Sequence, residues 1–294
     1  MEKFLLRSLR FVPGHNEKLM TSATKSKADV LLLDVEDSVQ PMANKQIARD
    51  TILKYLNSGL FNGRKIFPRV NDRESGELLK DITQLAVNGI TGFMYPKSKN
   101  GEDVYFFDKL LETIEYEKNI PVGTFKIIPL IETAAAVLNA REICLASDRV
   151  IAIAYGSEDF ITDLEGIHDA EHESLFTPRS IIAMAARATN KAPIDTVHIR
   201  VHDLEDLEKN LIVSKNLGFE GMLVLNPKEI PLVHKYYSPS ENEIKNANEM
   251  LVLSEQAQKS GEGVAIINGK FIGPPMIKSA KKILYKQNLI EKNR

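Results

Sequence analysis

Cysteine, tryptophan and long apolar runs are scarce or absent in this sequence of 294 residues. The single cysteine, Cys144, has no partner for an intramolecular disulfide, which is typical of proteins kept in a reducing compartment. No apolar run reaches the roughly 18 to 20 residues that a transmembrane helix needs. The opening segment "MEKFLLRSLRFVPG" is interrupted by Arg7 and Arg10, unlike the core of a signal peptide. We therefore expect a cytoplasmic protein with no membrane partner.

An excess of one charge is also missing. The chain has 38 basic and 40 acidic residues, for a net charge of −2, and no basic stripe. Since nucleic-acid binding requires such a stripe, we expect no nucleic-acid partner. The hydrophobic fraction of 43% and the charged fraction of 27% are ordinary for a globular enzyme. The length suits either two average domains or one α/β barrel.

Eight short apolar runs alternate with longer amphipathic stretches. Near-continuous apolar runs favour a parallel sheet covered on both faces. The runs are 9–14, 30–37, 65–71, 92–97, 126–133, 150–159, 196–201 and 221–227, and the helical patterns are 15–28, 43–57, 76–87, 102–117, 134–145, 178–189, 204–217 and 238–258. Eight such units predict a (β/α)₈ TIM barrel. A doubly wound open sheet is the alternative, although no GxGxxG follows the first run.

The C-terminal sequence has a different pattern. Ser240 and Glu243 predict a capping box at the start of the eighth helix. The segment "VAIINGKFIG" places Asn-Gly between two apolar runs, which is typical of a hairpin, and a last helix is expected from about Pro275. We therefore predict a catalytic barrel over residues 1–260 and an extension over 261–294 that contacts a neighbouring subunit.

Polar residues follow most of the predicted strands, where a TIM barrel has its active site. Glu132 in "FKIIPLIETAAAV" and Asp159 follow neighbouring strands, and two carboxylates suit a Mg²⁺ site. Alternatively, each carboxylate caps the helix behind it. Arg69 could grip a carboxylate or stabilise an enolate. It could also form a salt bridge to the acidic "DVED" cluster, which contains Asp34, Glu36 and Asp37.

Histidine and serine patterns point to no other chemistry. His168 and His172 are four residues apart, and His198 and His202 lie in or after a predicted strand. Without a third histidine or an HExxH pattern, neither pair predicts a zinc site. No serine lies in a GxSxG nucleophile elbow.

Several segments together resemble one known family. They include "RSLRFVPGHNEKLM", "ADVLLLDVEDSV", "FPRVN", "PLIETAAAV" and "YGSEDF", followed by "GFEGMLVLNPKEI" and "GKFIGPPMIKSAKKIL". In this order they resemble the HpcH/HpaI aldolase and citrate lyase β-subunit family, in its CitE-like branch. The resemblance extends over almost the whole chain and implies a (β/α)₈ barrel with Mg²⁺.

The resemblance also implies a chemistry and a set of site residues. Relatives cleave citryl-, malyl- or citramalyl-type thioesters by retro-Claisen chemistry, on CoA or on an acyl-carrier protein. By motif, Glu132 and Asp159 would bind Mg²⁺, and Arg69 would stabilise the thioester enolate. Arg7 and Lys18 would lie near the CoA phosphates or the thioester. A homotrimer or larger homo-oligomer is implied as well.

Two positions depart from the family pattern. Gly273 stands where relatives commonly have an aspartate that acts as an acid or base, and Asn226 stands where a histidine is common. Because glycine transfers no proton, Glu36, Asp37 or metal-bound water would have to replace the aspartate. We predict a Mg²⁺-dependent carbon–carbon lyase. The alternatives are Claisen condensation or thioester hydrolysis at the same site, or a non-catalytic subunit that binds CoA thioesters.

Overall fold

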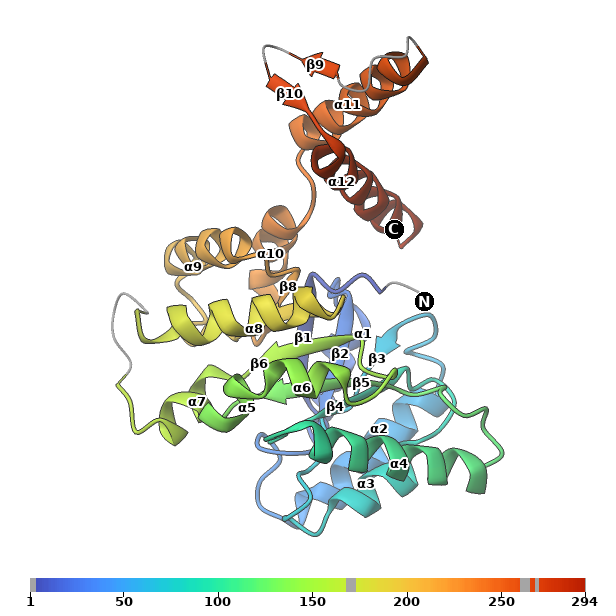
Figure 1. Cartoon of the computed structure of the whole chain (residues 1–294). Helices are drawn as coiled ribbons and strands as arrows, with labels where there is room; N and C mark the ends of the chain where they lie inside the picture. Colours follow the sequence, from blue (N-terminus) through green and yellow to red (C-terminus); the bar gives the residue numbers. More distant parts are fainter. Residues whose placement is uncertain (1–3, 168–172, 260–264, 268–269, 294) are drawn as a thin grey trace. The chain divides into compact units, whose positions relative to one another are not determined.

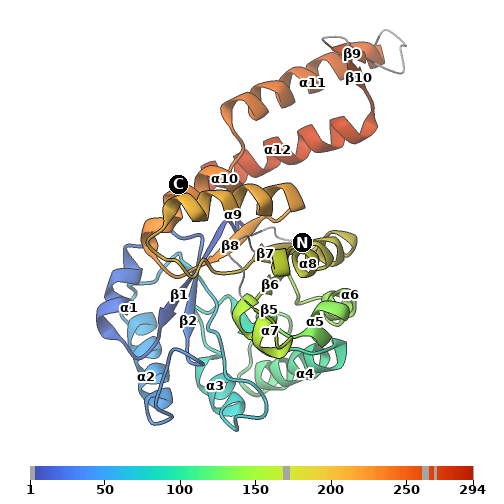
Figure 2. The same ribbon diagram turned by 90° about the vertical axis from the view of Figure 1, so that its left-hand side faces the viewer.

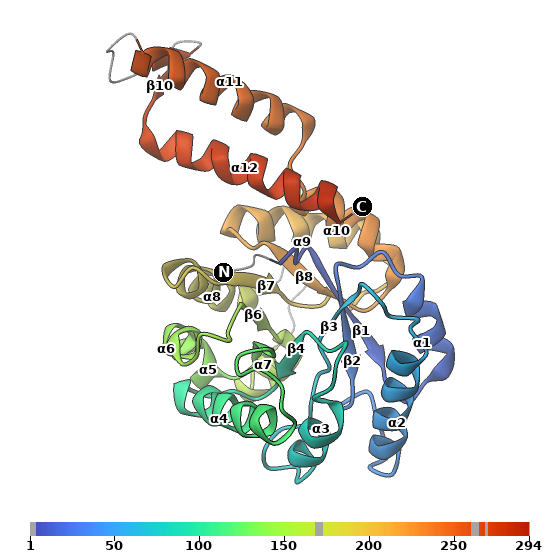
Figure 3. The ribbon, with the colours of Figure 1, turned by 90° about the vertical axis from the view of Figure 1, so that its right-hand side faces the viewer.

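The computed structural model describes residues 4–167, 173–259, 265–267 and 270–293. Eight strands form one sheet in the order β3-β2-β1-β8-β7-β6-β5-β4, with parallel pairing between neighbours (Figure 1). Helices surround these strands (Figures 2 and 3). The strands are β1 (Ser8–Pro13), β2 (Val30–Asp34), β3 (Lys65–Ile66), β4 (Gly92–Tyr95), β5 (Lys126–Ile131), β6 (Ala152–Tyr155), β7 (Ala192–Asp195) and β8 (Gly221–Val224).

The backbone of Arg69 joins the two ends of this sheet. It forms parallel bridges with Asp34 after β2 and with Met94 in β4. The Arg69 N–H donates to the carbonyl of Leu33 at 3.0 Å, and the Met94 N–H donates to the carbonyl of Pro68 at 2.9 Å. Regular strand β3 is short because Pro68 has no N–H to donate. These bonds close the barrel and confirm the predicted (β/α)₈ fold.

Most helices agree with the helical patterns of the sequence. The predicted helix 134–145 is divided at Asn139 into α5 (Ala134–Leu138) and α6 (Ala140–Leu145). Among the described residues, no helix combines the length and apolarity needed to cross a bilayer. The other barrel helices that confirm the patterns are α1 (Glu17–Thr24), α2 (Asn44–Asn57), α3 (Leu78–Leu85), α4 (Gly101–Glu117), α8 (Phe176–Ala188, preceded by the 3₁₀ turn Glu173–Leu175) and α9 (Leu204–Leu217).

The seventh strand lies at a different position from the one that the sequence predicts. β7 precedes the predicted run 196–201, which forms no strand. That run has alternating apolar residues, but the Thr196 hydroxyl bonds to the Ser157 hydroxyl at 2.7 Å instead of packing in a sheet. Pro193 obscures β7 in the sequence, because proline is uncommon inside central strands.

Two helices have no counterpart among the predicted helical patterns. Helix α7 (Ser157–Asp163) begins inside the predicted strand 150–159, directly after β6. Helix α10 (Ile230–Tyr237) follows β8 through the 3₁₀ turn Pro227–Glu229. Both are eight residues or shorter, so their sequences show too few turns for a clear helical period.

The C-terminal residues form a second compact unit. The chain divides into Leu6–Val233 and a unit made by Met1–Leu5 with His234–Arg294. This division falls before the predicted boundary at residue 260, because α11 (Glu241–Lys259) packs along α12 (Pro274–Lys292). Strands β9 (Ala265–Ile267) and β10 (Lys270–Ile272) pair antiparallel, which confirms the hairpin. Its Asn-Gly turn lies outside the described residues.

The predicted capping box at α11 is present. The backbone N–H of Ser240 donates to Glu243 Oε2 at 2.7 Å, and the N–H of Glu243 donates to Ser240 Oγ at 3.2 Å. This local signal needs only four residues, which explains why the sequence reveals it.

Candidate active site

A pocket of about 550 Å³ opens at the carboxyl ends of the barrel strands. This volume is typical of a site for a small molecule or part of a cofactor. Residues of β1, β2, β5, β6 and β8 line it, together with residues that follow β7 and β8. Its charged lining residues are Arg10, Asp34, Asp37, Arg69, Glu132, Glu158 and Asp159.

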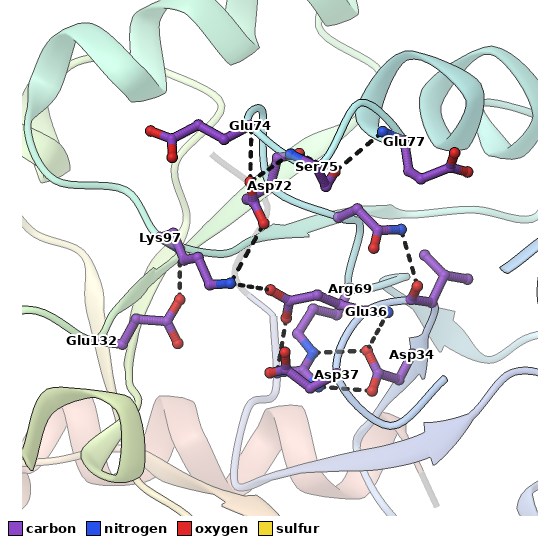
Figure 4. A network of polar contacts seen from close by, with 12 residues as sticks. Asp34, Glu36, Asp37, Arg69, Asp72, Glu74, Ser75, Glu77, Lys97 and Glu132 are labelled. Atoms are coloured by element: carbon purple, nitrogen blue, oxygen red, sulfur yellow. Dashed lines mark hydrogen bonds and ion pairs between the residues drawn. The ribbon is translucent and has the colours of Figure 1, made fainter. Parts of the chain in front are cut away.

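The side chain of Arg69 is surrounded by carboxylates (Figure 4). Its Nε and Nη2 donate to the two oxygens of Asp34, each at 2.7 Å. Its Nη1 donates to Asp37 Oδ2 at 3.0 Å and lies 3.1 Å from Glu36 Oε2. The guanidinium also stacks 4.7 Å from the ring centroid of Phe11. Arg69 is therefore held rigidly at the mouth of the barrel.

The bidentate contact determines the charges of Arg69 and Asp34. Burial alone would raise the pKa of Asp34, but the charge and hydrogen bonds of Arg69, together with the Ser38 hydroxyl, hold it below the ordinary value. Burial likewise disfavours charged Arg69, whereas Asp34 raises its pKa. Both groups are thus ionised. The salt bridge that the sequence allowed for Arg69 is present, and Arg69 also lines the pocket.

The carboxylate of Glu36 differs from that of Asp34 in accepting no hydrogen bond within the described residues. Only 3% of the residue is exposed, and neither carboxylate oxygen has a hydrogen-bond partner among the described residues. Its ion-pair partners are Arg69 and Lys97, whose Nζ lies 3.5 Å from Oε1. Burial raises the pKa of Glu36 to about 8, since desolvation outweighs the attraction of Arg69 and Asp37 adds repulsion. Glu36 can therefore carry a proton at neutral pH.

Lys97 links three of the carboxylates in Figure 4. Its backbone N–H donates to Glu132 Oε1 at 2.6 Å, while its Nζ lies between Glu36 and Asp72, at 3.5 and 3.4 Å. Its φ of 52° is in the left-handed region, which a residue with a side chain rarely adopts. Lys97 adopts this strained conformation at the point where its N–H contacts Glu132. Strained residues are often found at functional sites.

Glu132 is a buried carboxylate directly after β5. It is 2% exposed, and burial holds its pKa well above the usual value, with added repulsion from Glu36 and Asp159. A Cβ atom at Gly156 would lie 3.0 Å from Glu132 Oε2 and 2.9 Å from its Cβ. Glycine at position 156 therefore leaves room for this carboxylate.

Glu132 and Asp159 fit a hard cation. Asp159 is exposed in the first turn of α7 and lines the same pocket. Within the described residues, Glu132 Oε2 and the Asp159 carboxylate form no hydrogen bond or ion pair that would compete with a metal. Among the residues that the structure describes, no third protein ligand completes a site there. Mg²⁺ commonly uses one or two carboxylates and fills its other positions with water or substrate oxygens.

Two residues predicted near the cofactor are separate from this cluster. Arg7 precedes β1, so it lies at the opposite end of the strands from the pocket. Its guanidinium is paired with Asp29 at 2.8 and 3.0 Å. Lys18 is exposed on α1 and is not a lining residue, although its neighbour Leu19 is one.

The remaining polar candidates have structural contacts. His198 Nε2 lies 2.9 Å from Asp206 Oδ2 in the segment after β7. Asn226 caps the turn after β8, where its Nδ2 donates to the carbonyl of Val201 at 2.8 Å. Gly273 is the N-cap residue of α12. His168 and His172 lie outside the described residues.

The sequence patterns do not identify Arg10 or Gly156 as site residues. Arg10 lies in β1 between apolar neighbours, and no local motif marks it. Gly156 stands inside "AYGSED", where its role depends on Glu132, 24 residues earlier. Both assignments require contacts between separate strands.

Comparisons with known proteins show which family the chain resembles. The model of the HpcH/HpaI aldolase/citrate lyase family matches residues 7–227. Citrate lyase subunit beta of Leuconostoc mesenteroides subsp. cremoris is 32% identical over 280 residues, which cover 95% of this chain and 92% of that protein. A (3S)-malyl-CoA thioesterase of Cereibacter sphaeroides is 27% identical over 284 residues, which cover 97% and 95%.

A solved structure with bound ligands is similar as well. It is protein CitE from Mycobacterium tuberculosis in complex with magnesium, acetoacetate and coenzyme A. The match has a TM-score of 0.72 and 26% sequence identity, and it covers 96% of this chain and 100% of that one.

Proposed function

The chain belongs to the HpcH/HpaI aldolase/citrate lyase family, and on that premise we propose that it is a Mg²⁺-dependent carbon–carbon lyase. Its substrate would be a short 3-hydroxyacyl-CoA of the citryl, malyl or citramalyl type. One observation carries the proposal: Arg69, Glu132 and Asp159 line a single pocket at the carboxyl ends of the strands. The products would be a 2-oxo acid and acetyl-CoA or another acyl thioester.

Glu132 and Asp159 would hold the metal. When bound, Mg²⁺ would lower the pKa of the substrate hydroxyl and polarise the forming carbonyl. The Glu132 carboxyl must lose its proton to act as a ligand, and a cation beside it would favour that loss. The Lys97 N–H would keep the Glu132 side chain oriented toward the pocket.

Arg69 would stabilise the negative charge that develops on the thioester. As the C–C bond breaks, its electron pair forms an enolate whose oxygen needs a positive partner. Asp34 fixes two of the guanidinium nitrogens, whereas the Nη1 partner Asp37 has a side chain that is 52% exposed. Movement of Asp37 toward solvent would leave Nη1 beside Glu36, and Nη1 could donate to the enolate oxygen because the Glu36 carboxyl is neutral when it holds its proton.

Glu36 would supply the proton that completes the reaction. Its pKa of about 8 keeps it protonated at neutral pH, and it lies beside Nη1 of Arg69. The substrate hydroxyl would release its proton to solvent as its oxygen becomes the carbonyl of the 2-oxo acid. Transfer of the Glu36 proton to the enolate carbon would give the acyl thioester, and the Glu36 carboxylate, which faces Arg69 and Lys97, would then regain a proton from solvent. Glu36 would thus replace the aspartate whose position Gly273 occupies.

A cleavage assay tests this proposal. The protein is incubated with malyl-CoA, citramalyl-CoA and citryl-CoA, with Mg²⁺ and then with EDTA, and the products are followed by mass spectrometry. We expect cleavage of at least one substrate in Mg²⁺ and a loss of that cleavage in EDTA. Unchanged substrates in both conditions would refute the lyase proposal.

Hydrolysis is the second candidate, because a full-length relative is named a thioesterase. The same assay distinguishes it: free CoA with an intact hydroxy acid indicates hydrolysis, whereas a 2-oxo acid indicates cleavage.

A thioester on an acyl-carrier protein is assayed in parallel to test the carrier. Binding without any turnover would instead favour the non-catalytic subunit. Lys18 stays our candidate for contact with the CoA phosphates, and a cytoplasmic location stays a prediction.

We also propose a homotrimer or larger homo-oligomer, with the C-terminal extension in the subunit contact. Deletion of residues 262–294 should then reduce the number of subunits per particle, calculated from the mass that light scattering measures. An unchanged number of subunits would refute this role of the extension.

A further inference from the structure

The charges around the pocket are unequally paired. Arg69 already contacts Asp34, Glu36 and Asp37. Three other carboxylates line the pocket, those of Glu132, Glu158 and Asp159. An anionic substrate in this pocket needs a further positive charge, because three carboxylates already contact Arg69.

Arg10 is a second cation of the pocket lining, and the described residues provide no partner for it. It is 4% exposed, and its Nε is buried without a hydrogen bond. Its neighbours across the sheet are Leu31 in β2 and Val224 in β8, which are apolar. No carboxylate of the described residues lies within ion-pair distance of its guanidinium.

An unpaired guanidinium in an apolar setting is costly, so proteins normally pair it. Burial also lowers the pKa of Arg10, with no neighbouring carboxylate to oppose the effect. Other buried arginines of this chain have such partners, as Arg49 has in Asp81 and Arg179 in Asp195. A group from outside the polypeptide would provide the missing negative charge.

We propose that Arg10 forms an anion subsite of the pocket and binds a carboxylate or phosphate group of the substrate. Leu19 and Ser22 of α1 line the same pocket, as do Leu225 and Pro227 after β8. This inference rests on the proposed function and adds a substrate contact to it. The anion is either a carboxylate of the acyl part or a phosphate of CoA, and both suit a guanidinium.

The experiment compares Arg10→Leu with the wild-type chain in calorimetric titrations that require no turnover. Pantetheine lacks both the phosphates and the adenosine of CoA, while citrate and malate, each with Mg²⁺, report on acyl carboxylates. Loss of a charge-assisted hydrogen bond should weaken binding about 10- to 100-fold. A loss for CoA but not for pantetheine assigns the contact to the phosphorylated nucleotide part of CoA, and a loss for citrate or malate identifies a carboxylate.

Thermal unfolding separates the subsite from a structural role. Because Arg10→Leu replaces an unpaired charge with an apolar side chain, it should keep or raise the Tm in the absence of ligand. Arg10→Lys retains the charge and should recover part of the affinity. Equal affinity of Arg10→Leu and wild type for every ligand overturns the subsite, whatever the Tm.

The two proposals can fail separately. If the wild-type protein cleaves a thioester and Arg10→Leu binds and cleaves it equally well, only the subsite is refuted. If the wild-type protein binds none of the four ligands and cleaves no substrate, both are refuted.

Discussion

Two clusters around buried arginines differ in how their carboxylates are paired. On the barrel wall, Glu115 accepts hydrogen bonds from Nη1 and Nη2 of Arg149 and from the backbone N–H groups of Gly123 and Phe125. At the mouth, Arg69 faces three carboxylates, and Glu36 among them accepts no hydrogen bond within the described residues. Both Glu115 and Glu36 are buried.

The difference separates stabilising polar contacts from contacts suited to chemistry. A buried carboxylate with several donors is satisfied and has no reason to bind a further group. A buried carboxylate without donors prefers to hold a proton or meet a cation. We therefore infer that the Arg149 cluster supports the fold, whereas the Arg69 cluster and Glu132 are prepared for a metal and substrate.

The largest effect is expected for Glu132→Gln. Because the amide removes the ligand charge, kcat should fall by about 10³-fold or more, equivalent to several kcal/mol of metal stabilisation. Isothermal titration should show weaker Mg²⁺ binding. The matched control is Glu74→Gln, since Glu74 is an exposed glutamate that does not line the pocket. Normal turnover by Glu132→Gln would contradict the assignment.

Arg149→Met tests the wall cluster. Removal of one partner leaves Glu115 buried with an uncompensated charge, which should lower the free energy of unfolding by about 3–5 kcal/mol. Urea denaturation measures this loss. The folded fraction should keep its kcat, and a selective loss of kcat without a loss of stability would erase the distinction between the clusters.

Glu36→Gln should affect activity and stability in opposite directions. Loss of a general acid should lower kcat by about 10²- to 10⁴-fold. Because the pKa of Glu36 in the folded protein is about 8, wild-type kcat should fall as the pH rises above that value. The variant should lack this alkaline limb of the pH–activity profile. Glu115→Gln is the comparison variant, because it should lose stability and keep the limb.

The pH dependence of stability follows from the same shift. The pKa of Glu36 is raised on folding, so its contribution to stability is complete below its unfolded pKa and is lost as pH rises toward about 8. The Tm difference between Glu36→Gln and wild type should therefore grow between about pH 4.5 and 8 and then level off. Calorimetry at several pH values measures it, and a constant difference would argue against the raised pKa.

The smallest effect is expected for Ser240→Ala, which removes the side-chain half of the α11 capping box. Such a change typically costs about 1 kcal/mol. Since Ser240 belongs to the C-terminal unit, the variant should unfold slightly earlier in urea with unchanged kcat. A change in kcat as large as that of Glu36→Gln would contradict the separation of roles.

The sequence by itself determined the barrel and the positions of the candidate site residues along it. Eight apolar runs with polar ends are local patterns, and they placed Arg69, Glu132 and Asp159 at the ends of their strands or in the turn that follows. The capping box at Ser240 and the C-terminal hairpin were readable for the same reason. β7 was misplaced because Pro193 and the alternation of 196–201 are local signals that the tertiary contacts overrode.

The tertiary structure alone decided how these groups interact. That Arg69 closes the barrel, that Lys97 orients Glu132 and that Glu36 is buried without a hydrogen bond depend on strands distant in the sequence. Charge and proton affinity are set by desolvation and by neighbours across the sheet. Residue type alone therefore identified the acids and bases of the site, but only the packed barrel determines which of them are paired.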